Sequence, residues 1–215
     1  MPSPFTTLFV DVGGVLLTNS WDHVARHRAA EHFDLDYEAM NRRHYLVYTL
    51  YEEGKLSLEE YLKRTVFYED RPFSQEDFQD FMLAQSEAQP QMIQLVRDLK
   101  TRHGLKVAAI SNEGWELAAH RIEKFALKTF VDFFIFSCFV CCRKPDPEIY
   151  YRALDIAQVR PEAVVYVEEQ PMFVEVAKSL GIRAFSYSGD KVTRQTLAAL
   201  GLSPEEQAGG EPLTR

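Results

Sequence analysis

The spacing of hydrophobic and polar positions changes character twice along the chain. Residues 6–10 form a short apolar run that breaks at the glycine pair 13–14, which predicts a buried parallel strand. From residue 19 to about residue 85 the apolar positions recur at helical spacing only, and we expect about four helices there. Two of them are expected to begin at Ser57 and Ser74, because an acidic residue three positions later resembles a capping box.

After residue 90, helical and strand patterns alternate. Alternation of this kind predicts a parallel sheet with helices on both faces. The expected elements are a helix over 91–103, a strand over 106–110, a helix over 114–125, a strand over 133–138, a helix over 147–156, a strand over 163–167, a helix over 172–180 and a strand over 183–187.

The first strand is therefore separated from the others by a helical insert. We expect an α/β fold, a doubly wound, Rossmann-like parallel sheet core with a small all-helical cap subdomain. The predicted boundaries are 1–17 and 89–202 for the core and 18–88 for the cap. The polar, glycine-rich segment 203–215 is expected to be a flexible tail.

Composition and charge narrow the classes of partner. The 215 residues carry 24 Lys and Arg against 32 Asp and Glu, so the net charge of −8 argues against nucleic acid and anionic membranes as partners. No apolar run approaches the ~20 residues of a membrane helix, and the N-terminus does not resemble a signal peptide. Cys138, Cys141 and Cys142 have no disulfide-framework spacing, so we expect a cytoplasmic protein.

Polar residues follow four of the predicted strands. Asp11 follows the first, Ser111 and Asn112 the second, Lys144 the third, and Glu168 and Glu169 the fourth. Each has an ordinary structural explanation, as a turn former, a helix N-cap, a solvated loop or a helix start. Ligands of doubly wound sheets bind at the carboxyl ends of the strands, so their combination indicates a functional site.

These segments resemble the motifs of the haloacid dehalogenase-like hydrolase superfamily, in its phosphatase-type branch with a D-x-G-G first motif. The resemblance covers nearly the whole chain, and the helical insert lies where the family places its cap. The matching segments are LFVDVGGVL at 8–16, ISN at 110–112, KPDPEIY at 144–150, VYVEE at 165–169 and AKSLG at 177–181.

The resemblance implies a nucleophile and a metal. Asp11 would attack the phosphorus of a small phosphorylated metabolite and form an aspartyl-phosphate. Mg²⁺ would be held by Asp11, the backbone carbonyl of Gly13 and a carboxylate of the fourth motif. By position Glu169 is favoured as the direct ligand, and Glu168 is expected to bind directly or through water.

The resemblance also implies which residues bind the phosphoryl group. Lys144 would pair with both the nucleophile and the phosphate, since two negative groups must approach one another. The Ser111 hydroxyl and the backbone N–H of Asn112 would hold the phosphoryl oxygens.

Two positions depart from the usual pattern of the family's phosphatases. Gly13 occupies the place of a second aspartate, which protonates the leaving group, and loss of such a group typically costs ~10²–10⁴ in rate. Glu168 and Glu169 replace the commoner pair of aspartates, which would shift the metal or change its coordination. Two alternatives therefore stay open, a 2-haloacid dehalogenase with Asp11 attacking carbon, and a catalytically weak binding or regulatory protein.

Aromatic residues of the insert have two interpretations. Tyr45, Tyr48, Tyr51 and Tyr61 either form the core of a small helical bundle or contribute to a substrate pocket.

Overall fold

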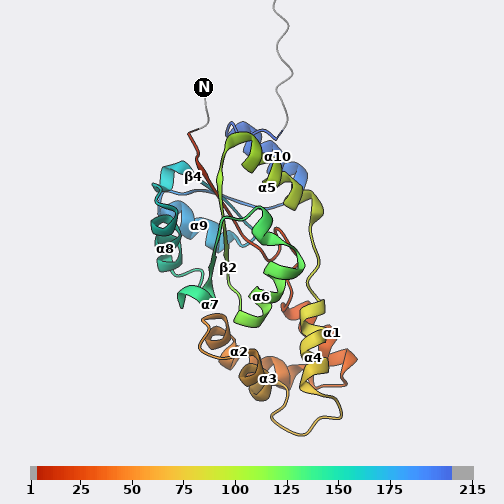
Figure 1. Cartoon of the computed structure of the whole chain (residues 1–215). Coiled ribbons are helices and arrows are strands. Elements are labelled where there is room, and N and C mark those ends of the chain that lie inside the picture. The colour runs from red at the N-terminus through yellow and green to blue at the C-terminus, as the bar shows by residue number, and fades with distance from the viewer. Residues whose placement is uncertain (1–3, 205–215) are drawn as a thin grey trace, which may run out of the picture.

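The computed structural model describes residues 4–204, and its centre is a five-stranded parallel sheet (Figure 1). The strand order is β3-β2-β1-β4-β5, so β1 lies in the middle, and the expected α/β Rossmann-like fold is confirmed. The strands are β1 (Thr7–Val10), β2 (Lys106–Ser111), β3 (Phe133–Phe136), β4 (Val164–Glu168) and β5 (Arg183–Ser186).

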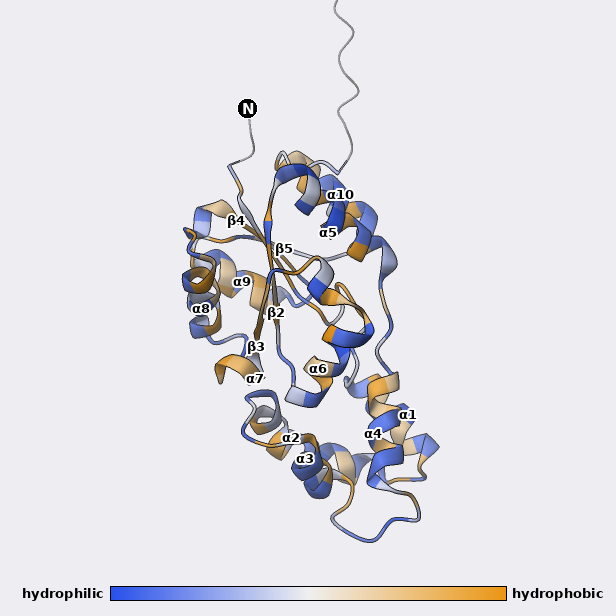
Figure 2. Cartoon of the chain, viewed as in Figure 1, coloured by the Kyte–Doolittle hydropathy of each residue, from blue (hydrophilic) through white to orange (hydrophobic). Residues whose placement is uncertain are grey.

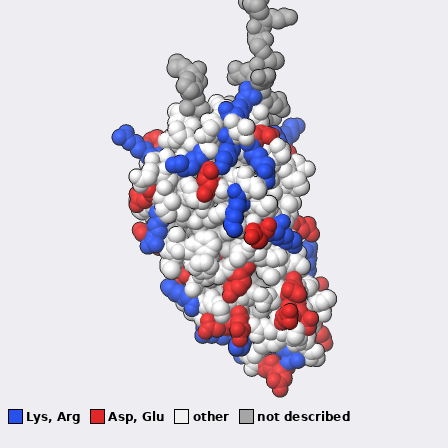
Figure 3. All heavy atoms as spheres, viewed as in Figure 1, with Lys and Arg blue, Asp and Glu red and all other residues white. Residues whose placement is uncertain are grey.

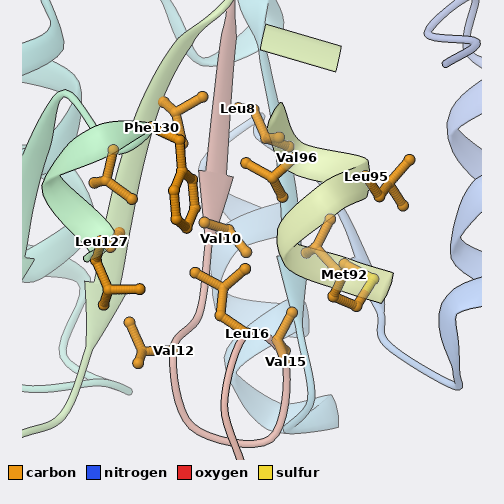
Figure 4. Close-up of a cluster of buried hydrophobic side chains, with 14 of the residues drawn as sticks. Leu8, Val10, Val12, Val15, Leu16, Met92, Leu95, Val96, Leu127 and Phe130 are labelled. Atoms are coloured by element: carbon orange, nitrogen blue, oxygen red, sulfur yellow. The ribbon is translucent and has the colours of Figure 1, made fainter. Parts of the chain in front are cut away.

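Two hydrophobic cores cover the two faces of the sheet. Alternate residues of β1 supply both, since successive side chains of a strand point to opposite faces. Leu8 and Val10 pack with Met92 of the first face, as Figure 4 shows, and Phe9 packs into the second. Helices α5 (Pro90–His103), α6 (Trp115–Lys124) and α10 (Asp190–Ala199) cover the first face, while α8 (Pro147–Ala157) and α9 (Pro171–Ser179) cover the second.

The insert after β1 forms the four expected helices, which we call the cap. They pack around their own apolar core, and Figure 2 shows hydrophilic and hydrophobic positions mixed along each of these helices. Capping boxes begin α3 at Ser57 and α4 at Ser74, as the sequence predicts. The four helices are α1 (His23–His32), α2 (Tyr37–Glu52), α3 (Leu58–Thr65) and α4 (Gln75–Ala84).

The two chain segments that join cap and sheet pair with each other. Leu17 and Ala88 form an antiparallel bridge, and the N–H of Thr18 donates to the carbonyl of Glu87 over 2.8 Å. The cap is therefore fixed to the sheet by a paired hinge rather than by two independent linkers.

The structure differs from the expected elements in two places. The strand expected over 133–138 ends at Phe136, because its partner β2 ends at Ser111, and the short helix α7 (Ser137–Val140) follows. Helix α10 was not expected from the sequence, where only Thr193 and Leu197 mark a buried face. Two 3₁₀ turns complete the fold, Leu127–Thr129 and Pro161–Ala163.

Within residues 4–204 every helix is too short or too polar to cross a bilayer. Most of the predicted tail over 203–215 lies outside the described residues.

Candidate active site

The carboxyl ends of the strands bring the predicted site residues to one edge of the sheet. Asp11 follows β1, Ser111 ends β2 and Glu168 ends β4, while Lys144 lies between α7 and α8. A cavity of about 310 Å³ lies between this edge and the cap, and the predicted residues that line it are Asp11, Ser111, Asn112, Lys144 and Glu169. Gly13 and Glu168 are not among the residues that line it.

Lys144 is the centre of a buried charge cluster. Its Nζ lies 3.0 Å from Asp11 Oδ1 and 2.6 Å from Glu168 Oε2. The Asn112 amide fixes the lysine backbone, since it donates to the carbonyl and accepts from the N–H of Lys144, each over 2.9 Å. Burial would lower the pKa of Lys144, but Asp11 and Glu168 raise it above its usual range. The lysine is therefore a fixed positive charge beside Asp11.

The two carboxylates around Lys144 differ in their electrostatics. Burial raises the pKa of Asp11 well above its ordinary value, the negative Glu168 adds to the rise, and Lys144 opposes it. Burial would also raise the pKa of Glu168, but Lys144 and the N–H of Gln170 bring it below its ordinary value. One lysine thus faces more negative charge than it can neutralise.

The adjacent glutamates of the fourth motif have different surroundings. Glu168 is fully buried and its oxygens accept from Lys144, from the hydroxyl of Tyr166 and from the N–H of Gln170. Glu169 lines the cavity, where the Asn19 amide donates to its two oxygens over 3.1 and 3.2 Å. Of the two, Glu169 has the carboxylate that faces the cavity.

Gly14 is required for the position of Glu169. Its φ of +73° favours glycine, and a Cβ there would lie 1.8 Å from Glu169 Oε2. Gly14 therefore leaves room for a carboxylate that directly follows β4.

Asn19 fills the space beside Gly13, and sequence reasoning did not single it out. A Cβ on Gly13 would lie 2.8 Å from Asn19 Oδ1 and 3.7 Å from Arg121 Nη1. The amide that orients Glu169 thus occupies the room that a side chain at position 13 would need. A single polar residue at the entry of the cap carries no signal of this role in the sequence.

Arg121 of α6 links the site to the hinge of the cap. This buried arginine pairs with Glu113, donates to Ser86 Oγ over 3.0 Å and donates to the carbonyl of Thr18 over 2.6 Å. Thr18 and Ser86 belong to the two segments of the hinge. Glu113 also accepts from the Ser111 hydroxyl over 3.1 Å, so one buried network spans the hinge and the predicted phosphoryl-binding serine.

The aromatic residues of the cap divide between its core and the cavity. Tyr48, Tyr51 and Tyr61 line the cavity, while Tyr45 is 59% exposed and does not. Tyr51 and Tyr61 are also buried in the cap core, so both interpretations of this set hold in part. The ring of Tyr51 packs so closely on Gly114 that a Cβ there would lie 2.0 Å from its Cζ.

The Tyr61 hydroxyl links two aromatic side chains of the cavity wall, Trp21 and His44. It accepts from Trp21 Nε1 over 2.8 Å and lies 2.7 Å from His44 Nδ1. Burial lowers the pKa of His44 to about 3, and the nearby positive Arg26 adds to this effect, so the ring is neutral. His44 therefore contributes no positive charge to the cavity it lines.

Arg143 and Glu52 join the cap to the sheet at the cavity wall. Both nitrogens Nε and Nη2 of Arg143 reach the same oxygen, Oε2 of Glu52, over 2.8 and 2.7 Å. The guanidinium also lies 5.1 Å from the ring centre of Tyr48. Arg143 directly precedes Lys144, yet only the folded chain brings it to Glu52.

Comparisons with known proteins agree with this geometry. A family model described as haloacid dehalogenase-like hydrolase matches residues 5–181. A phosphorylated carbohydrates phosphatase of Thermotoga maritima is 30% identical over 159 residues, which cover 72% of this chain and 69% of that protein. Flavin mononucleotide hydrolase 1 of Arabidopsis thaliana is 25% identical over 162 residues, which cover 75% of this chain and 64% of that protein.

A solved structure shares the fold. A haloacid dehalogenase family enzyme of Bacteroides thetaiotaomicron, in complex with magnesium and inorganic phosphate, superposes with a TM-score of 0.72 at 18% identity. The match covers 86% of this chain and 94% of that chain. With a family model that spans most of its length, this chain belongs to the haloacid dehalogenase-like hydrolases.

Proposed function

We propose that this hydrolase is a magnesium-dependent phosphomonoesterase that acts on a small phosphorylated metabolite through an aspartyl-phosphate on Asp11. The observation that carries the proposal is the pairing of Asp11 with Lys144 over 3.0 Å at the floor of a cavity that the cap covers. The phosphatase name of the Thermotoga maritima relative supports the same reaction.

The donor set at the floor of the cavity fits Mg²⁺. Asp11 and Glu169 both line the cavity, and their carboxylate oxygens are the kind of ligand that Mg²⁺ prefers. Asp11, Glu169 and the backbone carbonyl of Gly13 would hold the ion, and Glu168 would stay bound to Lys144. The ion supplies positive charge that offsets the repulsion between the Asp11 carboxylate and the phosphoryl group.

The residues of the chain then perform a two-step displacement. An oxygen of Asp11 bonds to phosphorus while the bond to the leaving oxygen breaks, and that oxygen takes a proton from solvent. Water next attacks phosphorus, which releases inorganic phosphate and restores Asp11. Lys144 offsets the negative charge that builds up in both steps. The Ser111 hydroxyl, which donates to Glu113 in this structure, would turn toward a phosphoryl oxygen.

The experiment that tests the proposal is a screen of phosphorylated metabolites with and without Mg²⁺. We expect release of inorganic phosphate only when the metal is present. Halide release from a 2-haloacid without metal would instead assign a dehalogenase, since a halide leaves without a proton. If a folded protein released neither inorganic phosphate nor halide, the catalytically weak binding or regulatory role would be favoured.

Substitution of the two glutamates should separate metal binding from structure. Glu169→Ala is expected to weaken Mg²⁺ binding at least about tenfold, and activity should recover in part at high Mg²⁺. Glu168→Gln should leave Mg²⁺ affinity nearly unchanged but lower the melting temperature, because this residue faces Lys144. Calorimetric Mg²⁺ titration of the resting protein measures both affinities, and thermal unfolding measures the melting temperature. An unchanged affinity for Glu169→Ala would transfer the ligand role to Glu168.

The glycine at position 13 should make the enzyme sensitive to its leaving group. Without an acid there, a nitrophenolate leaves far more easily than an alkoxide, so we expect a high ratio of kcat/KM for aryl over alkyl phosphates. Gly13 has no positive φ that would forbid a side chain. The obstacle to Gly13→Asp is Asn19, whose Oδ1 lies 2.8 Å from the position of the new Cβ.

Gly13→Asp is therefore expected to slow aryl and alkyl phosphates together and to weaken Mg²⁺ binding, because Asn19 must release Glu169. Asn19→Ala alone is the matched control, because it removes the same contacts to Glu169 without adding an acid at position 13. Steady-state rates with p-nitrophenyl phosphate and glycerol 3-phosphate measure the effect. A selective gain for glycerol 3-phosphate in the Gly13→Asp variant would show that Asn19 yields without cost.

A further inference from the structure

The charges around the cavity constrain the part of the substrate that leaves. The acidic side chains that line it are Asp11, Asp22, Glu52, Glu113 and Glu169. Its lining contains two permanently charged cations, Arg143 and Lys144, among the described residues. Arg121 neutralises Glu113, and the other four carboxylates still outnumber the two cations in the space that a substrate would enter.

Both cations are already paired. Lys144 contacts Asp11 and Glu168, and it lies at the floor, where the phosphoryl group would bind. Arg143 is the cation at the cap side, and Glu52 takes two of its N–H groups. A second negative group on a substrate would therefore have to displace Glu52, at the cost of a half-buried ion pair.

The cap side of the cavity offers hydrogen-bond acceptors rather than unpaired cations. Both bonds from Arg143 reach Glu52 Oε2, which leaves Oε1 able to accept from a ligand. Asp22 lines the cavity as well, and its Oδ1 accepts from the N–H of Ala25 at the start of α1. Carboxylate oxygens of this kind accept from hydroxyl and ammonium groups and repel anions.

We infer that the leaving group donates hydrogen bonds and carries no negative charge, and that the Glu52–Arg143 pair is the element that selects for it. A polyol or sugar monophosphate meets this description, and so does a phosphorylated amino alcohol. Bisphosphates and phosphorylated carboxylic acids do not. The inference rests on the proposed phosphatase function. The small volume of the cavity, about 310 Å³, agrees with a leaving group of metabolite size.

Three small substrates test the inference in the wild type. Glycerol 3-phosphate carries a hydroxymethyl group at the position where 3-phosphoglycerate carries a carboxylate. Phosphoethanolamine carries an ammonium group. We expect kcat/KM for glycerol 3-phosphate to exceed that for 3-phosphoglycerate at least about tenfold, the size of one unfavourable charge contact. A higher kcat/KM for phosphoethanolamine than for glycerol 3-phosphate would identify an amino alcohol phosphate as the substrate. A lower kcat/KM would identify a polyol phosphate.

Glu52→Gln tests the selecting element itself. Loss of the carboxylate charge leaves Arg143 uncompensated, so the preference for glycerol 3-phosphate over 3-phosphoglycerate should fall at least about fivefold. Glu53→Gln is the matched control, because Glu53 is the next residue, pairs with Lys55 and lies outside the cavity lining. The control should keep the wild-type preference.

The outcomes separate this inference from the proposed function. Hydrolysis of p-nitrophenyl phosphate together with equal or better use of 3-phosphoglycerate would overturn the inference and leave the phosphatase standing. An unchanged preference in a folded Glu52→Gln variant would overturn the role of the pair. Failure of the wild type to hydrolyse any phosphate ester would remove the proposed function first, and the inference with it.

Discussion

An Asp11→Asn variant is expected to lose at least about a thousandfold in kcat while it keeps its fold. The amide cannot form the acyl phosphate, because its nitrogen and its carbonyl oxygen are poor nucleophiles. The fold should survive, since Glu168 alone still neutralises Lys144 over 2.6 Å. Removal of the Asp11 charge also relieves its repulsion with Glu168, so the melting temperature should stay or rise.

Steady-state phosphate release and thermal unfolding of the same preparation check this expectation. Asp36→Asn is the matched control, because Asp36 caps α2 away from the cavity and asparagine caps a helix about as well. The control should retain wild-type activity. Hydrolysis by a folded Asp11→Asn variant at the wild-type rate would remove Asp11 from the mechanism.

Lys144→Ala is expected to be the most damaging single change for both stability and activity. It leaves Asp11 and Glu168 buried without a cation, and removal of one partner from a buried ion pair costs about 3–5 kcal/mol. Activity should be lost at every Mg²⁺ concentration, because Lys144 is a fixed charge that added metal does not replace. This behaviour contrasts with the partial recovery expected of Glu169→Ala.

Urea unfolding and Mg²⁺-dependent rates measure the two effects separately. Lys63→Ala is the control, since Lys63 pairs with Glu59 on an exposed face of α3 and should change stability little. A Lys144→Ala protein that is as stable as the wild type would mean that Asp11 and Glu168 share a proton. Recovery of its activity at high Mg²⁺ would show that the lysine is dispensable.

Charged side chains are unevenly distributed on the face of the molecule that Figure 3 shows. Acidic side chains gather at the cap end of this face, while lysines and arginines lie mainly over the sheet domain.

Much of the site follows from the sequence because strand ends carry positional information. Asp11, Ser111 and Glu168 each end or follow a strand, and parallel strands bring their carboxyl ends to one edge. The same periodicity predicts the cap, with its four helices and its two capping boxes. Helix α10 escaped prediction because its apolar face is short, and β3 was predicted too long because only its partner β2 determines where pairing ends.

The remaining features depend on contacts between segments that are distant in the chain. Asn19 meets Glu169 across 150 positions, and Arg121 meets the hinge residue Thr18 across 103. The local pattern around each of these polar residues equally suits a solvated surface. The sequence by itself determined which elements form and which chemical groups stand at the strand ends, since periodicity and chain order are local properties. The tertiary structure alone decided which of two adjacent glutamates faces the cavity and which cations are already neutralised. Burial and charge pairing arise only when segments that are distant in the chain pack together.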